Sequence, residues 1–219
     1  MQDARNFQFS SDYPMAYFVY HSTHEITVPA MSGGVVSTAT ITVPHNLPFT
    51  PLLVGYWSDN ANFTNTNDLN VQMLGGDYKS LDAGADDTNI YITGANGKTS
   101  SIKLYVKLWA YMPPDANGDV QPVFDDSNYL FNSDNTVLEI AQAGVIKLND
   151  NPKTVYHNLG YVPYCRIWSK RYLNGRLVIT PQWQTNYRGS AYGGVVDDEK
   201  LVLGVAAGDE YYHIYTAEV

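Results

Sequence analysis

Short apolar segments separated by turn residues recur along the chain. The clearest is 102–111, where one set of alternate positions is apolar and the other is mixed: Ile102, Leu104, Val106 and Leu108 against Lys103, Tyr105, Lys107 and Trp109. A period of two indicates a strand with one buried face and one wet face. Further strands are predicted at 26–28, 39–43, 52–57 and 89–93. No segment combines helical apolar spacing with caps at both ends, so the pattern predicts an all-β chain.

The second half contains a predicted hairpin. Segments 164–172 and 176–183 flank Asn174 and Gly175, a pair that supplies the positive φ required by tight hairpin turns. We therefore expect two antiparallel strands here.

One internal repeat organises the whole chain. Segment 42–51 matches 154–163 without gaps at an offset of 112, with six of ten positions identical. The acidic pair at 86–87 also matches that at 197–198, and each pair is followed by an apolar segment. Self-similarity of this kind indicates a duplicated structural unit.

The repeat predicts two tandem antiparallel β-sandwich domains, jelly-roll or Ig-like, at 3–113 and 119–219. A linker is predicted at 114–118, because adjacent prolines at 113–114 stop strand pairing and Asn117 with Gly118 favours a turn.

The repeated motif has the composition of a structural loop between two strands. Its Asn can adopt positive φ, its Leu can close the end of the core, its Pro can precede the next strand, and its His can bond to backbone groups. A role of the His as ligand or base is the alternative interpretation. The motif residues are His45, Asn46, Leu47 and Pro51 in the first copy, and His157, Asn158, Leu159 and Pro163 in the second.

The predicted hairpin concentrates basic and aromatic residues in an otherwise acidic chain. It could bind an acidic patch on a partner or stack on sugars; alternatively, its aromatics are core and its cations protect a sheet edge. The candidate partner-binding residues are Arg166, Lys170, Arg171, Tyr172 and Arg176, accompanied by Trp168 and Trp183.

Charge and composition exclude several classes of function. The 219 residues include 13 Lys and Arg against 22 Asp and Glu, a net charge of −9, which disfavours binding to nucleic acid or anionic lipid. A single cysteine, Cys165, excludes an intrachain disulfide framework. The chain shows no signal peptide and no apolar run of membrane-spanning length.

No residue pattern supports catalysis, a metal site or a cofactor. His21 and His24 would point to opposite faces of a strand, so they could not easily share a metal ion. Acidic residues that could hold calcium fit no calcium loop and are interpreted as solvated turns: Asp82, Asp86, Asp87, Asp125, Asp126, Asp197, Asp198 and Glu199. We therefore expect a protein that is not an enzyme and binds neither metal nor cofactor.

The segments 9–15, 42–51 and 55–58, with the second loop at 157–163, resemble small β-domains of structural proteins in tailed bacteriophages. The resemblance implies a virion component of the tail, baseplate, fibre or capsid, made in the host cytoplasm without a signal peptide. Its expected partners are other virion proteins and copies of itself. The alternative function is a receptor- or carbohydrate-binding module with a host glycan as ligand; exposed rings flanked by Asp and Asn would favour it, and buried rings would favour assembly.

Overall fold

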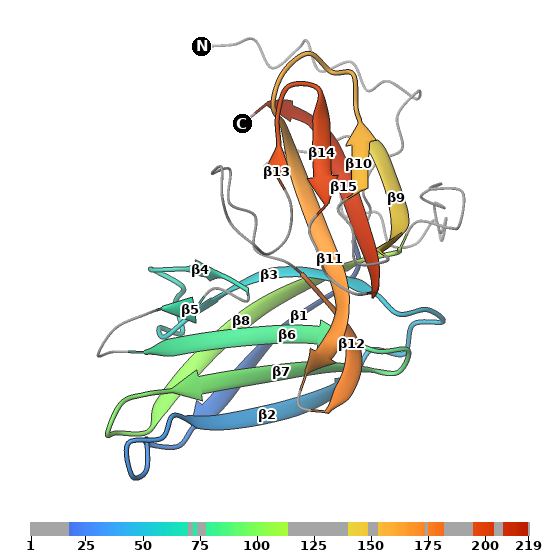
Figure 1. Cartoon of the computed structure of the whole chain (residues 1–219). Coiled ribbons are helices and arrows are strands. Elements are labelled where there is room, and N and C mark those ends of the chain that lie inside the picture. Colours follow the sequence, from blue (N-terminus) through green and yellow to red (C-terminus); the bar gives the residue numbers. More distant parts are fainter. Residues whose placement is uncertain are drawn as a thin grey trace.

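The computed structural model describes residues 18–69, 72–73, 78–113, 140–148, 153–173, 175–181, 195–203 and 208–218. Every regular element among them is a β-strand, and the strands pair antiparallel, which confirms the all-β prediction (Figure 1). Within these ranges there is no apolar helix that could span a membrane.

The first half of the chain forms two sheets. One has the order β1-β8-β3-β4, and the other contains β2-β7-β6, with β5 paired to β6. The first strand thus pairs with the last, and the second with the second-last. The strands are β1 (Phe18–Val28), β2 (Ser37–Pro44), β3 (Leu52–Ser58), β4 (Asn67–Asp68), β5 (Gln72–Met73), β6 (Lys79–Ala85), β7 (Asn89–Asn96) and β8 (Ile102–Tyr111).

The core of this half lies between the two sheets. One apolar cluster takes side chains from β1, β3 and β8 on one side and from β6 and β7 on the other. In β8, Leu104, Val106 and Leu108 are fully buried in it, while Tyr105, Lys107 and Trp109 lie on the opposite face and stay partly exposed. The predicted alternation along 102–111 is therefore confirmed.

The second half repeats the strand pairing of the first. The order β9-β15-β11 matches β1-β8-β3, and β10-β14-β13 matches β2-β7-β6. A second apolar cluster takes side chains from both groups of strands. The strands are β9 (Ile140–Leu148), β10 (Lys153–Tyr156), β11 (Pro163–Leu173), β12 (Arg176–Pro181), β13 (Val195–Val196), β14 (Lys200–Leu203) and β15 (Gly208–Glu218).

The two halves also share a sheet, which the sequence did not predict. In Figure 1, β11 reaches from the second half to the first, where β12 lies beside β6. Ile179 of β12 pairs with Ala85 of β6. One eight-stranded sheet therefore contains β2, β5, β6 and β7 of the first half and β9, β11, β12 and β15 of the second. The division at 3–113, 114–118 and 119–219 stays a prediction, because 114–139 lie outside the described residues.

Candidate interaction surfaces

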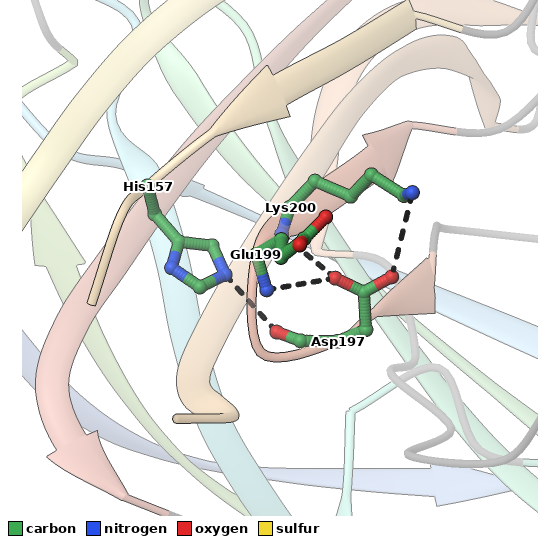
Figure 2. A network of polar contacts seen from close by, with 4 residues as sticks. All are labelled: His157, Asp197, Glu199 and Lys200. Atoms are coloured by element: carbon green, nitrogen blue, oxygen red, sulfur yellow. Dashed lines mark hydrogen bonds and ion pairs between the residues drawn. The ribbon is translucent and has the colours of Figure 1, made fainter. Parts of the chain in front are cut away.

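The repeated His loops have the same internal geometry in both copies. Nε2 of His157 lies 3.0 Å from the carbonyl oxygen of Asp197 (Figure 2), and the amide of Leu159 donates to Nδ1 at 3.3 Å. Because an amide can only donate, Nδ1 accepts and Nε2 carries the proton given to the carbonyl. His45 makes the equivalent bonds to Asp86 and Leu47, each at 3.0 Å.

The remaining motif residues follow the same plan. Asn46 and Asn158 both have φ of 55°, as predicted for the turn. Pro51 immediately precedes β3, and Pro163 is the first residue of β11. Leu159 packs against the second core, whereas Leu47 is half-buried. The interpretation of both His residues as structural agrees with this geometry, since both rings are buried and both nitrogens bond to backbone.

Aspartates at the neighbouring turns also have structural roles. Oδ1 of Asp197 accepts the amides of Glu199 and Lys200, and its Oδ2 lies 3.8 Å from Nζ of Lys200 (Figure 2). Backbone hydrogen bonds are the main cause that lowers the pKa of Asp197. Oδ1 of Asp86 accepts the amides of Thr88 and Asn89 in the same way. Asp197 and Asp86 therefore lie in turns, as expected, and their carboxylates also fix the turn backbone by accepting its amides.

Asp82 is a correction to the sequence interpretation. It lies in β6 opposite Thr93 rather than in a solvated turn. Burial raises its pKa, even though Arg171 approaches its Oδ2 to 3.9 Å and acts in the other direction. Its neighbours Ser80, Ala83, Gly84 and Ala85 are too small to give a clear strand signal.

The other ligand candidates do not come together. His21 is exposed on one face of β1, while His24 lies on the half-buried face and bonds to Ser22. The described ranges contain no group of three or more residues placed to hold a metal ion. Asp125, Asp126 and Trp183 lie outside the described residues.

The basic side chains of the hairpin, β11 and β12, make contacts largely within the chain. Nε of Arg171 donates to Thr180 at 2.7 Å, and the same guanidinium faces Asp82. Arg176 donates to the hydroxyl of Tyr91 at 3.0 Å and lies 4.9 Å from that ring's centroid. These two arginines therefore attach the hairpin to β6 and β7 of the first half, and both cations are already engaged within the chain.

Trp168 anchors the hairpin to the other sheet of the first half. Its ring is fully buried, and its Nε1 donates to the carbonyl of Leu53 at 2.6 Å. Leu52, Val54 and Tyr111 of the first half form a cluster with Trp168 and Ile179. Together with the arginine contacts, this cluster joins the two halves.

Part of the hairpin remains outside these contacts. Tyr172 and Leu177 are direct cross-strand partners, 73% and 44% exposed respectively, and Lys170 is exposed on the same face. We call these three residues the hairpin end. Arg166 lies further back on β11, with its guanidinium 5.3 Å from the Tyr164 ring centroid.

A row of aromatic rings lies on the outer face of the β1-β8-β3-β4 sheet, beside the part of that face on which the hairpin packs, and the sequence did not predict it; one of its rings, Trp109, also packs against the cluster of Trp168 and Ile179. Neighbouring centroids are 5.5 Å apart for Phe63 and Tyr56, 5.5 Å for Tyr56 and Trp109, and 6.1 Å for Trp109 and Phe18. We call these four residues the aromatic ribbon. Trp109 belongs to the mixed face of 102–111, which the sequence shows. That this face lies beside Tyr56 follows only from the register of β3 and β8.

The sequence also did not indicate that two titratable groups, Glu210 and Cys165, are buried. Burial raises the pKa of Glu210 to about 7; its Oε1 accepts a hydrogen bond from Ser169, and its Oε2 has no hydrogen-bond partner among the described residues. Burial also raises the pKa of the Cys165 thiol to about 12, so this cysteine is a packed core residue with little thiolate.

Comparison with known proteins gives no match among family models, curated proteins or solved structures.

Proposed function

We propose that the chain is a non-enzymatic structural subunit of a tailed-bacteriophage virion, assembled with copies of itself and with other particle proteins. The resemblance of its two loop motifs to phage β-domains supports the virion setting. The one structural observation that supports the assembly role is the exposure of the hairpin end.

The hairpin end has the chemistry of a protein contact. It combines an exposed Tyr and Leu with a cation, Lys170, in a chain of net charge −9. Aromatic side chains are enriched in protein interfaces, and a cation beside them complements the net negative charge of another copy. A neighbouring copy is therefore a suitable partner.

The experiment replaces Tyr172 and Leu177 with Ser. These side chains are exposed, so the variant should keep the fold, whereas replacing Arg171 or Arg176 would also break the junction between the halves. In sedimentation equilibrium, the wild-type chain should associate as its concentration rises, and the variant should not. The matched control is Tyr156→Ser, since Tyr156 is 62% exposed but lies elsewhere, on β10. Equal association of all three proteins would contradict the role of the hairpin end.

A receptor- or carbohydrate-binding module is the second candidate, favoured by one specific observation. Although Trp168, Trp57 and Tyr91 are buried, the aromatic ribbon leaves partly exposed rings beside an Asn- and Asp-rich loop.

A further inference from the structure

Three rings of the aromatic ribbon are positioned by strands of one sheet. Trp109 and Tyr56 stand on the central strands β8 and β3, and Phe18 stands on β1 next to Trp109. Trp109, Tyr56 and Phe63 are partly buried with part of each residue exposed, and Phe18 is 54% exposed. The rigid sheet behind them positions the rings.

A polar loop borders the ribbon at β4. Residues 59–68 contain four Asn, two Asp and two Thr, and nearly all of them are exposed. The loop is ordered by its own bonds: Asn62 donates its amide to the side chain of Asn60, and Phe63 donates to the Asn60 carbonyl. Asp68 pairs with Tyr56, so a carboxylate lies directly beside the rings.

Phe63 is held against its conformational preference. It is a bulky residue with φ of 54°, in the left-handed region that such residues rarely adopt. Its ring meets Tyr56 edge-on, and Nζ of Lys107 lies 4.7 Å from its centroid. Backbone strain of this kind persists where surrounding contacts fix it, and it clusters at binding sites.

We propose that the aromatic ribbon and loop 59–68 form a carbohydrate-binding surface for a glycan of pyranose rings. Pyranose rings present C–H groups on their faces and hydroxyls around their edges. The faces suit stacking on Trp109, Tyr56 and Phe63, and the hydroxyls suit the amide and carboxylate groups of the loop. Lys107 adds a donor between the rings.

A glycan fits this surface better than a protein partner does. The core of a protein interface is depleted in charged residues such as Asp, whereas here Asp68 lies directly opposite Tyr56. The proposal does not depend on the assembly role, because the ribbon and the hairpin end are different residues on different strands. Each can fail while the other holds.

The test uses the purified full chain on a printed array of bacterial surface polysaccharides and of linear hexose and N-acetylhexosamine hexamers. The chain should bind at least one glycan, and titration of that glycan in solution should change tryptophan fluorescence. Trp109→Ala should raise the Kd by about tenfold or more, as for a central aromatic contact. Phe63→Ser should also weaken binding; because Phe63 lies in a loop, this variant tests the site if Trp109→Ala does not fold.

Matched controls are Tyr172→Ala and Tyr156→Ala, which remove exposed rings outside the ribbon and should leave the Kd unchanged. The proposal is overturned if no glycan on the array binds, or if the control variants lose binding as strongly as Phe63→Ser. A third outcome is that the chain binds no glycan but self-associates, and that Phe63→Ser abolishes this self-association. The ribbon would then be a contact between copies instead.

Discussion

At the residue scale, the repeated His residues show how a loop can be fixed by one buried ring. His45 connects the 86–89 turn to the loop after β2, because its two nitrogens bond to backbone groups on both. His157 does the same for the 197–200 turn. A neutral ring with one donor and one acceptor suits this role, and an apolar side chain offers neither group.

Replacing either His with Ala should lower the free energy of unfolding by about 1–3 kcal/mol, because two backbone groups lose their partner near the core. Chemical denaturation followed by tryptophan fluorescence measures this change. Thr42→Ala is the control, since its side chain is exposed on the adjacent strand. A loss as small as that of the control would show that the His bonds do not stabilise the loop.

Glu210 predicts a specific pH dependence. Its pKa rises from 4.5 to about 7 on folding, so the folded state binds the proton more tightly. The contribution of Glu210 to the free energy of unfolding is therefore greatest below pH 4.5. It decreases as the pH rises to 7, by an amount on the order of 3 kcal/mol. Glu210→Gln should remove this slope and be the more stable protein at pH 8. Identical pH profiles of thermal unfolding for the two proteins would contradict the assignment.

At the element scale, the β11–β12 hairpin determines how the halves are joined. Trp168 and Ile179 pack on β3 and β8, while Arg171 and Arg176 reach β6 and β7. The close approach of β12 to β6 requires Gly84, because a Cβ there would meet Thr180 and Val178 at 2.7 Å.

Trp168→Ala should weaken the contact between the halves by about 3–5 kcal/mol, since it removes a buried indole and its hydrogen bond. In scanning calorimetry we expect one unfolding transition for the wild-type chain and two for the variant. Trp57→Phe serves as a control that perturbs the first core without touching the hairpin. A single transition in Trp168→Ala would show that this contact does not couple the halves.

Strand positions and the loop motif could be predicted from the sequence because they depend on local patterns. The alternation at 102–111 and the Asn174–Gly175 turn predicted strands close to β8 and to the hairpin. β6 could not be predicted from its small side chains, and the internal use of Arg171 and Arg176 depends on contacts distant in sequence. The aromatic ribbon likewise forms only when β1, β8 and β3 lie in register.

At the scale of the whole molecule, the two copies have diverged where the hairpin docks. Gly84 and Tyr91 are direct cross-strand partners and both contact the hairpin. The cross-strand pair at the equivalent positions of the second copy is Val195 and Val202. The second copy therefore lacks, at these two positions, the Gly and Tyr that contact β12 in the first copy.

The proposal that the chain is a structural subunit of a virion is tested by quantitative mass spectrometry of purified particles of a phage whose genome carries the coding sequence. We expect peptides of the chain in a fixed, multiple-copy ratio to the other particle proteins, and we expect this ratio to survive repeated density-gradient purification. Abundant chain in the lysate together with its absence from purified particles would rule out a structural role in the virion.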